Sequence, residues 1–311
     1  MSKTFKSLAL ACIAMFAGIM SYAQVTTSAL SGKITDAKGT PLEGVAIVAN
    51  HTPSGTVYGA ITNSEGRYTI QGMRNGGPYT VEVSCLGYQS VVYNDITLQL
   101  AETYNLDSKI QESSEFLDEV VVVATPTSKF AAQEKTGAST NISNENILAM
   151  PSVNRSVSDM AKLSPYGGSG MSFAGMDGRS ANFTIDGANF NNNFGLSDGL
   201  PGGGNPVSLD AIDEIQVVVS PYDVRQSNFI GGGINAVTKS GTNKFKGTAY
   251  VYHQNEELHG NRALRKELGD RQESRVTTYG FTLGGPIIKN KLFFFVNYEM
   301  TQAPGSCHFR I

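Results

Sequence analysis

The fold class is decided by the stretch Thr278-Tyr-Gly-Phe-Thr-Leu-Gly-Gly-Pro-Ile-Ile-Lys-Asn-Lys-Leu-Phe-Phe-Phe-Val-Asn-Tyr-Glu-Met-Thr301. Its first half alternates apolar with small or polar residues, and apolar residues again occupy every second position from Leu292 onward. The polar turn Lys289-Asn-Lys291 separates the two runs. A period of two predicts antiparallel strands with one apolar and one more polar face. A transmembrane β-barrel has this pattern, and a water-soluble sheet gives the same alternation.

The composition of the whole chain also favours a turn-rich β protein. The 311 residues allow two or three domains at roughly 100–200 residues per domain. Charged residues make up 16% of the chain, well below the ~25% of an average soluble domain. The formal net charge of -3 gives no basic excess for nucleic-acid binding. These values disfavour a helix bundle, a coiled coil and a polybasic binder, but they do not exclude an enzyme.

The first residues predict export from the cytoplasm. Two lysines precede the apolar run Leu8–Met20, which is too short to cross a ~30 Å hydrocarbon core as a helix. The run ends in Ser21-Tyr-Ala23, a small-x-small cleavage pattern, so we expect a signal peptide over residues 1–23 rather than a core helix. Cleavage leaves Cys85 and Cys307, and no CxxC pair indicates a disulfide framework or a zinc ribbon.

Residues 24–107 predict an antiparallel β-sandwich. Val45, Ile47 and Ala49 alternate with their neighbours, and turn clusters recur at the spacing typical of short sandwich strands. Two motifs, Gly32-x-Ile-x-Asp-x-x-Gly-x-Pro-Leu-x-Gly-Val45 and Thr62-Asn-x-Glu-Gly-x-Tyr68, resemble the carboxypeptidase-regulatory-like (prealbumin-type) domain. That module is the non-catalytic appendage of those peptidases, and the four histidines here lack the HExxH spacing of a zinc peptidase.

Residues 108–144 are expected to form a linker with one apolar interruption. We call this interruption the valine segment; it consists of Asp118, Glu119, Val120, Val121, Val122, Val123 and Ala124. Four consecutive valines favour a stiff, extended chain. The segment is interpreted either as an ordinary strand of a neighbouring domain or as an exposed strand that awaits the sheet edge of a partner.

Residues 145–240 predict an α+β domain. A helical pattern between Asn146 and Leu163 places Val157, Met160 and Ala161 on one face. The run Asn182-Phe-Thr-Ile-Asp-Gly187 carries a strong hairpin signal. Further on, a short helical turn at Leu209 leads into one strand, and glycines lead into a second strand that ends near Lys239.

In combination these residues resemble the TonB-dependent outer-membrane receptors. The valine segment resembles their TonB box, and Gly178–Gly187, Ser220-Pro-Tyr-Asp-Val-Arg225 and Gly231–Asn243 resemble their plug domain. The appended sandwich and the Pro-Tyr-Asp-Val-Arg phrase indicate the Oar-like branch. The resemblance implies a plug at 145–240, barrel strands from 241 to 301, the valine segment as the TonB-binding site, and uptake of an unknown extracellular ligand across the outer membrane.

The resemblance also suggests ligand-binding residues in two polar loops. These residues are Asn189, Phe190, Asn191, Asn192, Asn193, Phe194, Asp198 and Asn205; turn chemistry alone is the alternative explanation for them. No catalytic residue, cofactor or metal site is indicated, because the chain lacks a nucleophile elbow, a Walker A loop and a GxGxxG motif. The acids Asp186, Asp210, Asp213 and Glu214 are explained as turn residues and a solvated helix face.

The expected fold class is therefore mainly β: a prealbumin-type β-sandwich, an α+β plug domain, and the first strands of an incomplete transmembrane β-barrel. A plugged barrel of 22 strands needs on the order of 220 residues in strands. The residues after Ser240 suffice for three or four strands, and residues 302–311 leave the pattern, so the sequence predicts a truncated or frameshifted receptor. A surface adhesion or matrix-binding protein is the alternative function.

Overall fold

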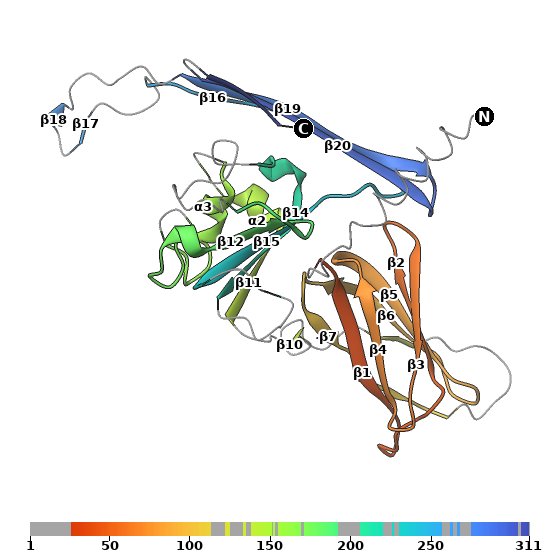
Figure 1. The fold of residues 1–311 in the computed structure, drawn as a ribbon. Helices are drawn as coiled ribbons and strands as arrows, with labels where there is room; N and C mark the ends of the chain where they lie inside the picture. The colour runs from red at the N-terminus through yellow and green to blue at the C-terminus, as the bar shows by residue number, and fades with distance from the viewer. Residues whose placement is uncertain are drawn as a thin grey trace, which may run out of the picture.

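The protein consists of three packed units, seen in a computed structural model (Figure 1). The structure describes residues 26–112, 122–124, 133–134, 138–150, 152, 155–168, 171–191, 206–219, 226, 230–256, 262–263, 266–267, 275–303 and 306–310. We call the units the sandwich (strands β1 to β8), the central unit (strands β11 to β15) and the outer sheet (strands β16, β19, β20 and β21). The outer sheet extends along one side of the central unit toward the sandwich.

The sandwich has two sheets, ordered β10-β7-β1-β4 with β8 beside β1, and β3-β2-β5-β6-β9. The short strands β9 (Val122–Ala124) and β10 (Gln133–Glu134) follow β8 in the chain and lie at the edges of these sheets. Its strands are β1 (Ser28–Asp36), β2 (Ala46–His51), β3 (Thr56–Ile61), β4 (Arg67–Met73), β5 (Gly76–Ser84), β6 (Val91–Leu98), β7 (Thr103–Asn105) and β8 (Ser108–Ile110). The alternating residues Val45, Ile47 and Ala49 are fully buried between the sheets, which confirms the predicted strand pattern.

The predicted linker is partly built into the sandwich. β8 pairs in parallel with β1, β9 (Val122–Ala124) pairs in parallel with β6, and β10 (Gln133–Glu134) pairs antiparallel with β7. Strands from residues 108–134 thus extend both sheets, because the sandwich offers free edges on which an extended, β-prone chain can complete its main-chain hydrogen bonds.

The central unit is a five-stranded sheet with short helices. The sheet is ordered β11-β14-β15-β12-β13. Its elements are β11 (Ala138–Ser143), α2 (Asn144–Ala149), α3 (Val157–Ala161), η1 (Gly178–Ser180), β12 (Asn182–Ile185), β13 (Ala188–Asn189), η2 (Leu209–Ala211), β14 (Ile212–Val219) and β15 (Gly232–Thr238). The predicted hairpin joins β12 to β13, and its turn residues Asp186 and Gly187 have φ angles of 47° and 83°, as a tight hairpin turn requires.

The helical pattern between residues 146 and 163 forms two short helices rather than one. The C-cap of α2, Met150, is extended with φ −79° and ψ 126°, because the proline that follows disfavours the helical conformation. In α3, the residues Val157, Met160 and Ala161 are buried, as the pattern predicts. The helix starts where Ser156 accepts a hydrogen bond from the Ser158 amide.

The outer sheet contains the strands that the first quoted sequence predicts. Its order is β16-β19-β20-β21, formed by β16 (Lys246–Gln254), β19 (Val276–Ile288), β20 (Leu292–Ala303) and β21 (Ser306–Arg310); β17 (Arg262–Ala263) and β18 (Lys266–Glu267) make a separate hairpin. Asn290 takes a positive φ of 62° in the turn between β19 and β20. Because β21 pairs with β20, the strands continue beyond residue 301, where the sequence placed their end.

The two faces of the outer sheet differ in chemistry and in exposure. Phe281, Leu283 and Val296 are 46%, 44% and 46% exposed, and the pairs Leu283–Val296 and Phe281–Tyr298 lie opposite each other on the outward face. On the inward face the polar residues Thr282, Asn297 and Glu299 are all less than 9% exposed. A water-soluble sheet would bury its apolar face, so this arrangement favours the lipid-facing interpretation of the alternation.

The helices in the described part of the chain are all too short or too polar to cross a bilayer.

Candidate functional site

The central unit contacts the inward face of the outer sheet through an aromatic and charged cluster. The Arg155 guanidinium pairs closely with the Asp210 carboxylate and lies 4.1 Å from the ring centroid of Tyr252 and 4.9 Å from that of Tyr250. Both tyrosines stand on β16. This contact combines a nearly buried ion pair with cation–π stacking, so it fixes the edge of the central unit to the sheet.

A second polar contact lies beside the first. Ser208 donates a hydrogen bond of 2.9 Å to Oε2 of Glu299, and the Tyr250 hydroxyl donates one of 2.8 Å to the same oxygen. Glu299 is only 3% exposed, although it belongs to a strand whose opposite face is apolar. The carboxylate is buried because the central unit covers it, and it is stabilised by one donor from the central unit, Ser208, and one from the outer sheet, Tyr250.

The sandwich is joined to the central unit through Glu214 on β14. Its carboxylate accepts hydrogen bonds from the Leu100 amide at 3.0 Å, from the Asn75 side chain at 3.2 Å and from the Asn141 side chain at 3.1 Å. The Leu100 carbonyl in turn accepts 2.9 Å and 3.0 Å bonds from Gln216 and Asn141. Burial raises the pKa of Glu214 to about 7, because these donors offset only part of the lost solvation.

These contacts correct the interpretation of the acids in this region. Asp210 and Glu214 are each 6% exposed. Asp210 pairs with Arg155 of the same unit, and Glu214 accepts hydrogen bonds from the sandwich, so the expectation that these acids lie on a solvated helix face is wrong. Polar and apolar residues are interspersed from Leu209 to Val219. No feature of this stretch indicates that its acids bind residues as distant in the chain as Asn75 and Leu100. Asp186, by contrast, accepts bonds from Thr238 at 2.6 Å and 2.8 Å and does act as a turn residue.

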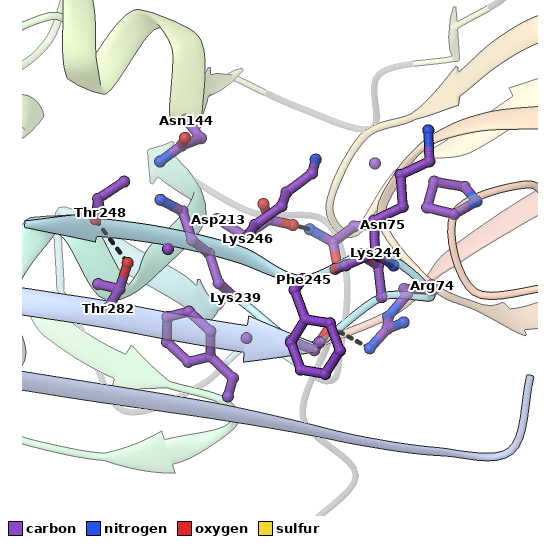
Figure 2. Close-up of a pocket in the computed structure, with 18 of the residues that line it drawn as sticks. Arg74, Asn75, Asn144, Asp213, Lys239, Lys244, Phe245, Lys246, Thr248 and Thr282 are labelled. Atoms are coloured by element: carbon purple, nitrogen blue, oxygen red, sulfur yellow. Dashed lines mark hydrogen bonds between the residues drawn. The ribbon is translucent and has the colours of Figure 1, made fainter. Parts of the chain in front are cut away.

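A cavity of about 670 Å³ lies where the three units meet (Figure 2). Arg74 and Asn75 reach it from the sandwich, Asp213 and Lys239 from the central unit, and Lys246 from β16. Burial lowers the pKa of Lys239 and raises that of Asp213, and nearby cations partly offset the second shift. Because the charged side chains among the described lining residues are four cations and one acid, Arg74, Lys239, Lys244, Lys246 and Asp213, the cavity favours anions over cations.

The valine segment is seen at Val122–Ala124, while residues 118–121 lie outside the described residues. Val122, Val123 and Ala124 form β9 and pair with Val91, Val92 and Tyr93 of β6. The expectation that the segment is left unpaired is therefore wrong for these three residues. The sandwich edge satisfies their main-chain groups, which is the simpler of the two sequence interpretations.

Three of the predicted ligand-binding residues are described, and all three have local structural contacts; the Asn189 side-chain oxygen accepts a 2.8 Å hydrogen bond from the Asn191 amide. Phe190 packs edge-on against Phe183 with ring centroids 6.5 Å apart. Asn191 accepts a 2.6 Å bond from the Phe183 amide and donates one of 2.8 Å to Asn182. Asn189 is exposed on β13. The others, Asn192, Asn193, Phe194, Asp198 and Asn205, lie outside the described residues. In the described part of the chain no group of acidic, histidine or cysteine residues could hold a metal ion.

Two family models match the chain at its two ends. The carboxypeptidase regulatory-like domain matches residues 29–111, which are the sandwich. The outer membrane beta barrel domain matches residues 237–306, which include β16, β19 and β20 of the outer sheet.

The curated relatives include a TonB-dependent transporter and a probable TonB-dependent siderophore receptor. The TonB-dependent transporter Oar of Myxococcus xanthus is 27% identical over 300 residues, which cover 90% of this chain and 27% of the relative. The probable TonB-dependent siderophore receptor PirA of Acinetobacter baumannii is 28% identical over 184 residues, 52% of this chain and 23% of the relative. The chain thus spans about a quarter of the length of these relatives.

Solved structures of related receptors show a more distant likeness. The siderophore receptor PirA from Pseudomonas aeruginosa aligns with a TM-score of 0.40 and 19% identity, over 55% of this chain and 29% of the receptor. The barrel-domain match and the curated relatives together place the protein in the cell outer membrane. The chain is thus similar to a TonB-dependent transporter over 90% of its length, and it contains regions that match the carboxypeptidase regulatory-like domain and the outer membrane beta barrel domain.

Proposed function

We propose that this chain acts in energised uptake across the outer membrane, with no catalytic role. In this proposal the central unit is the plug, the outer sheet is part of the barrel wall, and the valine segment is the site that binds TonB. The ligand would be recognised by the polar loops of the plug around Asn189 and beyond it. The transporter and receptor relatives support this proposal.

The observation that carries the proposal is the inverted polarity of the outer sheet. Its apolar face is exposed, and its polar face is covered by the central unit, as Glu299 and its bond from Ser208 illustrate. A plugged barrel needs this arrangement, because lipid surrounds the wall and a water-compatible domain fills the lumen. The contacts between the two units are polar and ionic, so they can break and re-form in water more readily than a packed apolar core.

The proposal is tested by a substitution in the valine segment. Val121→Pro removes one main-chain N–H donor, while Val121→Ala shortens the side chain and keeps the donor. We expect Val121→Pro to abolish capture of the chain by the periplasmic domain of TonB, and Val121→Ala to retain it. Equal capture of both variants would contradict the TonB role. Loss of cell adhesion in Val121→Pro, with TonB capture intact, would favour the adhesion function instead.

A further inference from the structure

The contact between the valine segment and the sandwich has a consequence for coupling to TonB. β9 occupies the outer edge of β6, with Val122 opposite Val91 and Ala124 opposite Tyr93. We propose that this edge of β6 is a docking site for the valine segment, and that the sandwich and TonB compete for the same main-chain groups. The docking itself is independent of TonB, whereas the competition rests on the proposed function.

The edge of β6 is a suitable receptor for an extended chain. In the order β3-β2-β5-β6-β9, β6 would be the terminal strand if β9 left, and a row of its N–H and C=O groups would lose their partners. Exposed edge strands invite pairing with other chains, and proteins commonly cover them. The valine segment has the same liability because of its high β propensity. Each strand therefore masks the other.

The chain is tethered so that the segment returns to this edge. Before the segment, the Gln89 amide donates a 2.9 Å bond to the Gln111 carbonyl, and Tyr88 forms an isolated bridge with Glu112. Both contacts lie directly before the start of β6. Glu112 and Val122 thus lie near the same end of β6, where Val122 pairs with Val91. A short connection of this kind gives an effective concentration in the millimolar range.

The docked state is suited to reversible release. The β6–β9 ladder spans three residues, and each main-chain hydrogen bond adds little net free energy in water. A partner that pairs with all residues from 118 to 124 makes a longer ladder and can displace the sandwich. Until it does, only the undocked fraction of the protein can bind, so the apparent affinity for TonB falls in proportion to that fraction.

A reversible cross-link tests the competition. Val92→Cys and Val123→Cys place two thiols at paired positions of β6 and β9, in a background where Cys12, Cys85 and Cys307 are replaced by serine. We expect oxidation of the full chain to form an intramolecular disulfide. The oxidised protein should bind the C-terminal domain of TonB at least roughly tenfold more weakly than the same sample after reduction. Comparison within one sample removes any effect of the cysteines on intrinsic affinity.

The matched control carries its cross-link at the opposite edge of the same sheet. Asn50→Cys and Val57→Cys pair β2 with β3, and oxidation there should leave TonB binding unchanged. Three results would overturn the proposal: no disulfide between β6 and β9, equal binding before and after reduction, or an equal loss of binding in the control. If neither the reduced protein nor a peptide of residues 118–124 binds TonB, the proposed function fails and the competition fails with it. If the β6–β9 disulfide forms but TonB does not bind, the proposed function fails while the contact between β6 and β9 is real; if no disulfide forms, the contact itself is missing.

Discussion

Replacing Glu214 by glutamine should remove a pH dependence from the junction between the sandwich and the central unit. The carboxylate is 6% exposed, and burial raises its pKa from 4.5 to about 7. Between pH 4.5 and about pH 7, this carboxyl is therefore more often protonated in the folded protein than in the unfolded chain. The free energy of unfolding is therefore highest below about pH 4.5 and falls as the pH rises to about 7.

The size of the effect follows from the same shift. A pKa that moves from 4.5 to about 7 corresponds to about 3 kcal/mol between the acidic and the alkaline limit. Asp213 adds a contribution of the same sign, because burial raises its pKa as well. The Leu100 amide reports on the junction directly, since it donates its hydrogen to Glu214 at 3.0 Å. Its protection from hydrogen exchange should fall by up to about a hundredfold between pH 5 and pH 8.

The assay is hydrogen exchange of the peptide that contains Leu100, corrected for the intrinsic rate at each pH. The wild-type protein should lose protection as the pH rises, and Glu214→Gln should show a shallower profile that keeps only the contribution of Asp213. Glu43→Gln is the matched control, because Glu43 is exposed and its substitution removes the same charge. Protection of Leu100 that is constant or rises toward pH 8 in the wild type would refute the reasoning, as would an unchanged slope in Glu214→Gln.

Three further substitutions test the packing of the units. Arg155→Ala leaves the nearly buried Asp210 carboxylate without its ion pair, so we expect a loss of about 3 kcal/mol in the free energy of unfolding, measured by denaturant unfolding in detergent. Val296→Lys places a charge on the outward face and should cost about 2–4 kcal/mol in folding into lipid vesicles. Gly232→Ala brings a Cβ within 2.6 Å of the Phe173 ring and should lower the thermal midpoint, at a cost of about 1–3 kcal/mol.

Each of these substitutions has a control and an outcome that would contradict it. Arg155→Lys keeps the charge but not the planar stacking, so it should recover part of the loss, and full stability of Arg155→Ala would disprove the anchoring role. Val296→Leu should fold into vesicles normally, whereas tolerance of lysine at this position would argue for a water-facing surface. Gly59→Ala is the control for Gly232, because its Cβ meets only the Ile47 carbonyl at 3.5 Å. Equal midpoints for the two alanine variants would contradict the close packing.

The strands of this fold are readable from the sequence because their signals are local. The alternation at Val45, Ile47 and Ala49 predicts a buried face that the structure confirms, and the Asp186-Gly187 pair predicts the turn between β12 and β13. In β19 and β20 the alternation predicts two faces but not which one is solvated. That question is settled by the central unit, which covers Glu299 and leaves Phe281 exposed.

The junctions could not be read from the sequence, because their partners are distant along the chain. Glu214 looks like a surface acid until the fold brings Leu100 to within 3.0 Å. The pairing of Val122 with Val91 is similar: high β propensity predicts that the valine segment is extended, but propensity does not specify the edge on which it lies. The local sequence pattern thus predicts the strands, whereas the junctions between the units depend on tertiary contacts that this pattern does not specify.

The central claim is that the outward face of the outer sheet meets lipid and its inward face meets the plug. Spin labels at Val296→Cys and Asn297→Cys test it, since the two residues are neighbours on β20 and differ in exposure, 46% against 8%. In the protein reconstituted in a bilayer, we predict that the label at 296 collides freely with oxygen dissolved in lipid, while the label at 297 is shielded. Equal accessibility at both positions, or greater accessibility of the label at 296 to a water-soluble reagent than to oxygen, would contradict the claim.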